Sequence, residues 1–198
     1  FRAPGSEAFY ASVRRADELL QSRLAAYKPH MERKPVVHAV GHSHIDVAWL
    51  WRLQHTREKV QRTFSTMLSL MERYPEFKYI QSQPQLYEFL KEDNPALYER
   101  VKERVKAGQW EVTGGMWVEA DCNLPSGESL VRQFLYGTRF IQDEFGKKCS
   151  ILWLPDVFGY SWALPQIIKK SGLKYFMTTK ISWSQFNRPE YDTFLWRG

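Results

Sequence analysis

Short apolar runs alternate along the chain with longer segments in which apolar residues recur at helical spacing. The apolar runs predict strands at residues 36–40, 77–81, 110–113, 151–154 and 175–179, and a sixth at 193–196. Apolar residues three or four positions apart predict helices at residues 54–73, 84–90, 95–108, 126–145 and 164–171. Strands that alternate with helices are typical of an α/β domain, in which a parallel sheet is covered by outer helices.

A separate amphipathic helix precedes this alternating pattern. Apolar residues at helical intervals predict it at residues 6–27, and Ser6 is a suitable N-cap. Residues 28–34 are polar and contain Pro29, which predicts a connector. We therefore divide the chain into residues 1–35, a helix with its connector, and residues 36–198, the α/β domain.

The composition is that of a globular protein. Hydrophobic residues make up 43% and charged residues 25% of the 198 positions. The chain has neither an apolar run long enough to span a membrane nor a signal peptide, so we expect a cytoplasmic protein without a membrane partner. It lacks an initiator methionine, so we interpret it as a fragment of a longer protein.

Cysteine content and charge indicate the cellular compartment and the kinds of partner to expect. Cys122 and Cys149 are too few for a disulfide framework, which predicts a reducing compartment. The net charge is +6, but lysine and arginine are interspersed with acidic residues instead of forming a basic block. With no nucleic-acid-binding signature present, we expect no nucleic-acid partner.

The first candidate site residues follow the first predicted strand, in the sequence VVHAVGHSHIDVAWLW. His42, His44 and Asp46 alternate along it, so on an extended backbone their side chains share one face. An imidazole beside a carboxylate makes half of a divalent metal site, although the same pair also caps turns. Trp49 follows at once and would offer a flat apolar face to a sugar ring.

A second strand ends in a similar way. The run SILWLPDVFGY delivers Asp156 directly after the strand at residues 151–154. Parallel strands joined by right-handed crossovers place their carboxyl ends on one face, where α/β proteins build their active sites. Lys180 follows the fifth strand, and Gly114 and Gly115 follow the third and would permit close approach of the backbone. We therefore expect one site assembled from several strand ends.

Three ordered motifs carry a family resemblance. HSHIDVAW, GGMWVEADCNLPSGE and WLPDVFGYS resemble the N-terminal catalytic domain of the family 38 α-mannosidases, in the branch with the bacterial and cytosolic-type enzymes. The resemblance implies part of a seven-stranded parallel β/α barrel. It also implies a metal-dependent retaining glycoside hydrolase that cleaves terminal α-linked mannose from oligosaccharides.

The resemblance further assigns roles to individual residues. It implies one divalent metal ion, zinc with cobalt as the alternative, held by His44, Asp46 and Asp156. Asp156 would also be the nucleophile, and His42 would orient a ligand. Trp49 would bind the sugar, and Lys180 would keep Asp156 ionised.

Other parts of the site follow less directly. Asp121 is a candidate acceptor for a sugar hydroxyl, in preference to Glu119. The resemblance places the remaining zinc-binding histidine and the general acid/base aspartate beyond Gly198. Residues 1–198 alone are therefore expected to be inactive, and the full-length protein is expected to be a homo-oligomer.

Two other functions fit the same residues. A different metal hydrolase, of the amidohydrolase type, would use His42 and His44 as joint ligands. A non-catalytic carbohydrate-binding module would use Trp49 and Asp121. A metal held by Asp46 and Asp156 favours the mannosidase over the amidohydrolase, and catalytic turnover would exclude a binding module.

Overall fold

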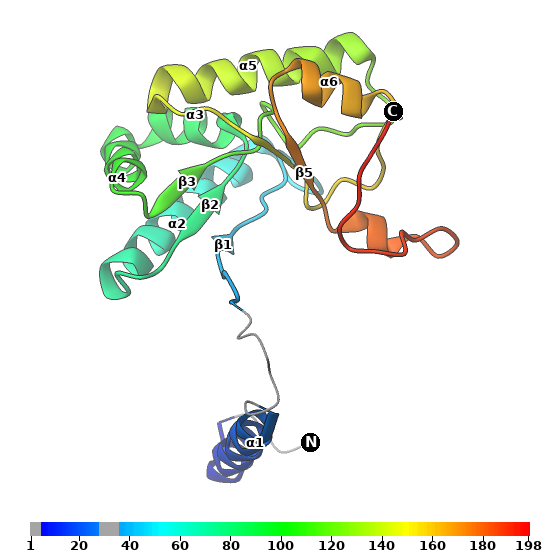
Figure 1. Ribbon diagram of the computed structural model, residues 1–198. Coiled ribbons are helices and arrows are strands. Elements are labelled where there is room, and N and C mark those ends of the chain that lie inside the picture. The colour runs from blue at the N-terminus through cyan, green and yellow to red at the C-terminus, as the bar shows by residue number, and fades with distance from the viewer. Residues whose placement is uncertain (1–4, 28–35) are drawn as a thin grey trace. The chain divides into compact units, whose positions relative to one another are not determined.

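The computed structural model describes residues 5–27 and 36–198 and divides the chain into two units, Phe1–His38 and Ala39–Gly198. In the first unit, helix α1 spans Glu7–Tyr27 and confirms the predicted helix (Figure 1). Ser6 caps it, because its Oγ accepts a hydrogen bond from the backbone nitrogen of Phe9 at 3.1 Å. The predicted connector at residues 28–34 lies outside the described residues.

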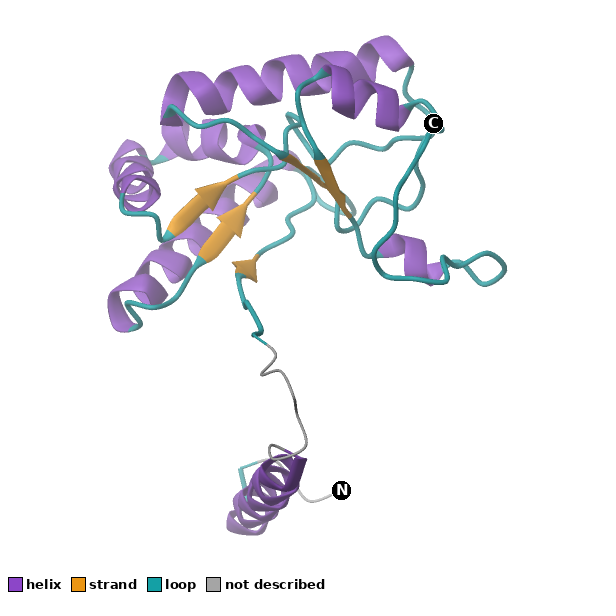
Figure 2. Cartoon of the chain, viewed as in Figure 1, coloured by secondary structure: helices purple, strands orange, loops and turns teal. Residues whose placement is uncertain are grey.

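The second unit is built on short parallel strands (Figure 2). They are β1 (Gly41–His42), β2 (Tyr79–Gln81), β3 (Trp110–Val112), β4 (Ile151–Trp153) and β5 (Tyr175–Met177). One sheet has the order β1-β2-β3 and the other pairs β4 with β5, all in parallel. A parallel bridge between Gly114 and Leu152 joins the end of β3 to β4. Neighbouring strands therefore follow one another in sequence order.

Helices pack around these strands and confirm the predicted α/β alternation. They are α2 (Leu53–Arg73), α3 (Pro84–Asp93), α4 (Pro95–Lys106), α5 (Gly127–Phe145), α6 (Leu164–Lys170) and the short 3₁₀ helix η2 (Lys180–Trp183). Local sequence explains their ends: the side chain of Ser126 accepts from Ser129 at the start of α5, and Gly146 ends that helix with a φ of 64°. No helix in residues 5–27 or 36–198 is long and apolar enough to cross a membrane.

Two predicted strands are wrong. Residues 36–40 are not in the ladder, and Val36, Val37 and Val40 are 75%, 86% and 49% exposed. Pairing with β2 begins only at Gly41, whose nitrogen donates to the carbonyl of Lys78 at 2.9 Å. Residues 193–196 also form no strand. Apolar runs alone predict both strands, whereas a strand also needs a hydrogen-bonded neighbour.

Two apolar clusters hold the second unit together. Around β2 and β3, Trp110 packs edge-on against Phe64 of α2 at 4.9 Å between ring centroids and against Tyr79 at 4.6 Å. Around β4, Leu152 packs in a second cluster with Phe134 of α5 and other residues of α5 and α6. These clusters fix the strands, so the loops that leave their carboxyl ends start from rigid positions.

Candidate functional site

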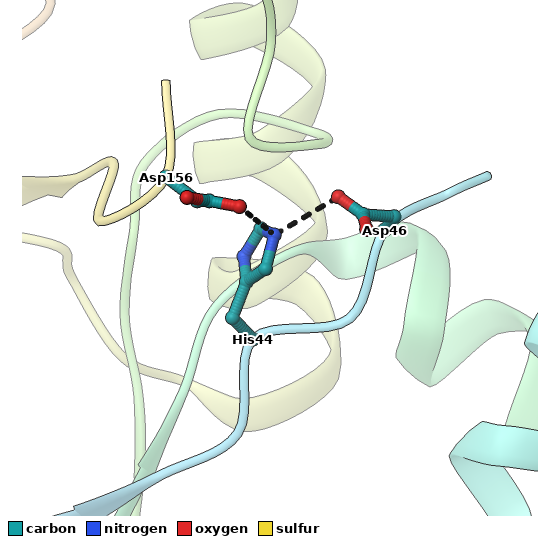
Figure 3. Close-up of side chains that lie close together, drawn as sticks. All are labelled: His44, Asp46 and Asp156. Atoms are coloured by element: carbon teal, nitrogen blue, oxygen red, sulfur yellow. Dashed lines mark hydrogen bonds and ion pairs between the residues drawn. The ribbon is translucent and has the colours of Figure 1, made fainter. Parts of the chain in front are cut away.

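His44, Asp46 and Asp156 come together at the ends of β1 and β4, as the sequence predicts (Figure 3). Nε2 of His44 lies 3.0 Å from Oδ1 of Asp46 and 3.2 Å from Oδ2 of Asp156. One ligand atom from each residue lies within 4.8 Å of the other two. Loops from two separate strands therefore converge on one point.

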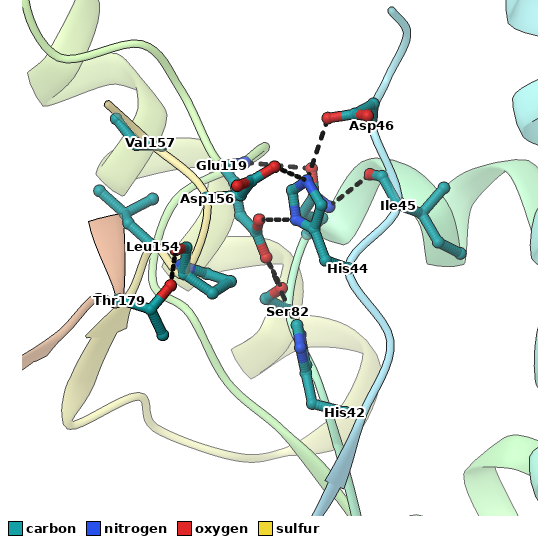
Figure 4. A network of polar contacts seen from close by, with 12 residues as sticks. His42, His44, Ile45, Asp46, Ser82, Glu119, Leu154, Asp156, Val157 and Thr179 are labelled. Carbon is teal, nitrogen blue, oxygen red and sulfur yellow. Dashed lines mark hydrogen bonds and ion pairs between the residues drawn. The ribbon is translucent and has the colours of Figure 1, made fainter. Parts of the chain in front are cut away.

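Glu119, from the loop after β3, lies beside the imidazole ring of His44 (Figure 4). Nδ1 of His44 donates to Oε2 of Glu119 at 2.5 Å, and Oγ of Ser82 donates to Oε1 at 2.5 Å. The Glu119 side chain is only 3% exposed, whereas that of His44 is 27% exposed. The sequence favours Asp121 over Glu119 as an acceptor for a sugar hydroxyl and does not indicate that Glu119 contacts His44.

Gln83 connects the loops that carry these residues. Its side-chain nitrogen donates to the carbonyl of Ile45 at 2.9 Å, and its side-chain oxygen accepts from the backbone nitrogen of Glu119 at 3.1 Å. Gln83 is 2% exposed and adopts a left-handed backbone with a φ of 64°. The loop after β1 is thereby linked to the loop after β3 through one buried amide.

The pKa values of His42 and His44 are shifted in opposite directions. Burial by itself lowers the pKa of His44, but the hydrogen bonds to Glu119 and Asp46 outweigh it and raise the pKa from 6.5 to about 9. Burial lowers the pKa of His42, with Glu119 opposing and His44 reinforcing the shift. Nε2 of His42 lies 3.9 Å from Glu119 and has no hydrogen-bond partner among the described residues. His42 is not one of the three converging residues.

Lys180 approaches the site from the end of β5. Its Nζ lies 2.6 Å from Oδ1 of Asp156, on the carboxylate oxygen that does not face His44. The ammonium group lies over the rings of Trp183 and Phe158, at 3.2 and 4.7 Å from their centroids. The Lys180 side chain is 8% exposed, so both the lysine and one edge of Asp156 are held in place.

Trp49 lies on the loop that follows Asp46. It is 68% exposed and meets Trp51 edge-on at 6.1 Å between ring centroids. Nε1 of Trp51 donates to Oγ1 of Thr56 at 2.9 Å, and Thr56 in turn donates to the carbonyl of Asp46 at 3.1 Å. A pocket of about 500 Å³ beside this loop is lined by residues that include His44, Asp46 and Trp51.

Asp121 is not joined to the converging residues. Its Oδ1 accepts hydrogen bonds from the backbone nitrogens of Asn123 and Leu124, both at 2.8 Å. This is the arrangement of an Asx turn, in which the carboxylate caps its own loop. The role of Asp121 in sugar binding stays a prediction.

Comparison with known proteins identifies the family. The family model described as the glycosyl hydrolases family 38 N-terminal domain matches residues 34–198. The chain belongs to this family. It is 54% identical over 167 residues to α-mannosidase G of Dictyostelium discoideum and 50% identical over 167 residues to human α-mannosidase 2C1. Each match covers 84% of this chain but only 15% and 16% of those proteins, so the chain spans a small part of its relatives.

A solved α-mannosidase structure has a similar fold. The α-mannosidase from Enterococcus faecalis V583 is 28% identical, with a TM-score of 0.65, over 70% of this chain and 16% of that one. A solved protein of glycosyl hydrolase family 38 from Enterococcus faecalis is 27% identical, with a TM-score of 0.59, over 69% of this chain and 16% of that one, so the family relationship rests on both sequence and structure.

The converging residues suit a divalent cation. An imidazole nitrogen and two carboxylate oxygens are donors that zinc binds at about 2.0–2.2 Å, which places tetrahedral ligand atoms about 3.4 Å apart. The separations of 3.0 and 3.2 Å from His44 Nε2 are close to this value. Glu119 completes the pattern in which a carboxylate holds the second nitrogen of a metal-binding histidine.

Proposed function

We propose that the full-length protein is a metal-dependent retaining α-mannosidase that releases terminal α-linked mannose from oligosaccharides. The observation that carries the proposal is the convergence of His44, Asp46 and Asp156 in a member of family 38. We propose these three residues as the ligands of one divalent ion, zinc with cobalt as the alternative. When bound, the ion would grip ring hydroxyls of the sugar and stabilise charge in the transition state.

In this proposal, Asp156 attacks the anomeric carbon. The attack forms a bond between a carboxylate oxygen and that carbon while the glycosidic oxygen leaves with a proton, and water then hydrolyses the resulting ester. The contact with Lys180 at 2.6 Å fixes one oxygen of Asp156, which supports its role as an oriented nucleophile. We propose that the exposed ring of Trp49 receives the apolar face of the sugar.

The leaving oxygen also needs an acid. Besides Asp156, two carboxylates contact His44: those of Asp46 and Glu119. Both are held by the histidine, so neither is placed to protonate the leaving oxygen. We therefore propose that the general acid comes from another part of the protein, and that residues 1–198 alone are inactive. General acid catalysis typically contributes about 10²–10⁴ in rate, so its absence alone would be severe.

The strand order and the two cysteines support the expected fold and cellular compartment. Parallel neighbours in sequence order, from β1 to β5, support the proposal that this unit is part of a seven-stranded β/α barrel. The free thiols of Cys122 and Cys149 support the reducing, cytoplasmic setting that the sequence predicts. The homo-oligomer stays a prediction.

The test is hydrolysis of an aryl α-mannoside by the full-length protein, with the first-formed sugar followed by NMR. We expect α-mannose as the first product, activity that is lost with a chelator and restored by zinc or cobalt, and inactivation by Asp156→Asn. The matched control is Asp143→Asn, because Asp143 is 64% exposed and pairs with Arg139 on the surface of α5. β-Mannose as the first product would contradict the role of Asp156.

One substitution separates the proposal from the amidohydrolase alternative. His42 lies outside the converging group, so His42→Ala should leave the metal content of the purified protein unchanged. Loss of the metal in His42→Ala, with retention in Asp156→Asn, would favour the amidohydrolase. Binding of mannosides without any turnover would favour the carbohydrate-binding module.

A further inference from the structure

Glu119 is a buried carboxylate to which the proposed reaction gives no step. Burying a carboxylate is unfavourable unless hydrogen bonds compensate the lost hydration. Both oxygens of Glu119 are compensated, Oε2 by His44 and Oε1 by Ser82, each at 2.5 Å. Ser82 and His44 come from loops after different strands, so Glu119 occupies the point at which three strand ends meet.

We propose that Glu119 is a positioning residue that fixes the ring of His44, so that Nε2 faces the point shared by Asp46 and Asp156. A carboxylate can only accept hydrogen bonds, so the contact with Glu119 requires a hydrogen on Nδ1. Nε2, which without an ion donates to Asp46 at 3.0 Å, is then the nitrogen that would give up its hydrogen to hold the ion. The contact with Glu119 also restricts rotation of the ring, which could otherwise turn Nε2 away. This inference rests on the proposed function.

Glu119 is itself held from both ends. Its backbone nitrogen donates to Gln83, and its carboxylate accepts from Ser82, so the side chain has little freedom to follow a moving histidine. The loop comes this close because Gly114 has no side chain. A Cβ at Gly114, where φ is 105°, would lie 2.8 Å from Cβ of Ser82. A rigid support of this kind is what a precisely placed ligand requires.

A merely structural role for Glu119 makes a different prediction. If Glu119 only stabilised the fold, its removal would lower the stability of the protein and would weaken metal binding no more than other equally destabilising substitutions do. If it positions His44, its removal weakens metal binding beyond what stability explains. The affinity for the ion, compared between variants of similar stability, therefore distinguishes the two roles.

The experiment measures the zinc dissociation constant of the full-length protein by competition with a chromophoric chelator, beside the melting temperature of the metal-free form. Loss of a group that orients a metal ligand typically weakens binding by about 10–100-fold, which is the change expected for Glu119→Ala. Glu119→Gln should restore most of the affinity, because its amide oxygen still accepts from Nδ1. The matched control is Glu144→Ala, which deletes another carboxylate with two hydrogen bonds, from Lys91 and Tyr98.

Three results would overturn the inference. Unchanged zinc affinity in Glu119→Ala would show that His44 is oriented without Glu119. Equal weakening in Glu119→Ala and Glu144→Ala would assign the effect to general destabilisation. Failure of the unsubstituted protein to bind zinc or cobalt would overturn the proposed function and this inference with it, whereas the first two results leave the proposed function intact.

Discussion

Removal of the Gln83 side chain should loosen the site without touching any proposed ligand. The amide of Gln83 bonds the carbonyl of Ile45, between His44 and Asp46, and also bonds the backbone nitrogen of Glu119. In Gln83→Ala both hydrogen bonds are lost. The left-handed φ of 64° is equally unfavourable for glutamine and alanine, so backbone strain cancels in the comparison.

The expected magnitude follows from these two bonds. Each contributes about 0.5–1.5 kcal/mol net, so their loss costs about 1–3 kcal/mol if water fills the vacated space. If the space stays dry, each unpaired backbone group costs about 1–3 kcal/mol, and the total rises to about 2–6 kcal/mol. A central value of about 2 kcal/mol corresponds to about 30-fold more frequent local opening.

The assay is hydrogen exchange at the backbone amide of Glu119, read beside the zinc dissociation constant. Gln83→Ala should exchange this amide about 30-fold faster and also weaken zinc binding, because the loop of His44 loses its anchor. The matched control is Gln133→Ala, since the side-chain oxygen of Gln133 accepts a hydrogen bond from the backbone nitrogen of Val118 in the same loop, at 3.0 Å. The control should speed exchange near Val118 and leave zinc affinity unchanged. Unaltered hydrogen exchange at the Glu119 amide in Gln83→Ala would contradict this prediction.

Two further substitutions test residues of α5 that stabilise the protein outside the site. Burial opposes ionisation of Glu144, but hydrogen bonds from Lys91 and Tyr98 outweigh burial and lower the pKa of this carboxyl. The ionised carboxylate therefore stabilises the folded protein at neutral pH, and this stabilisation is lost as pH falls through the lowered pKa. Denaturation midpoints should therefore show Glu144→Gln less stable than the unsubstituted protein at pH 7 and nearly equal to it in acid; an equal deficit at both pH values would contradict this. A Cβ at Gly137 of α5 would lie 2.5 Å from backbone atoms of the loop after β3. Gly137→Ala should therefore destabilise the protein by about 1–3 kcal/mol, although alanine has the better helix propensity. A raised denaturation midpoint in Gly137→Ala would contradict this prediction.

The sequence predicts the convergence of His44, Asp46 and Asp156 because the underlying rule is local. Each residue lies two to four positions after the end of β1 or β4, and parallel strands bring their carboxyl ends to one face. The helices are predictable for the same reason, since caps such as Ser126 and Gly146 act within one turn. Lys180 is predicted by the same rule, because it lies three positions after the end of β5.

Other features depend on tertiary contacts that no local pattern records. Glu119 and Asp121 lie two residues apart on one loop, and only the folded chain turns the first toward His44 and the second toward its own backbone. The amide link through Gln83 joins segments 38 positions apart in the chain, so no spacing rule reveals it. Residues 36–40 show the reverse case, in which an apolar pattern satisfies strand propensity but meets no neighbouring strand.

The charges around His44 give a physical reason for a cation at this point. The carboxylates of Asp46, Asp156 and Glu119 surround one imidazole, and Lys180 pairs with only one of them. With a neutral imidazole, this leaves an excess of about two negative charges in a partly desolvated space, where like charges repel strongly. Protonation of His44 offsets part of the excess, in agreement with its raised pKa, whereas a divalent cation would offset it fully. Because Glu119 contacts the imidazole of His44 and is not one of the three converging residues, its charge would add to the attraction for a cation without Glu119 being a direct ligand.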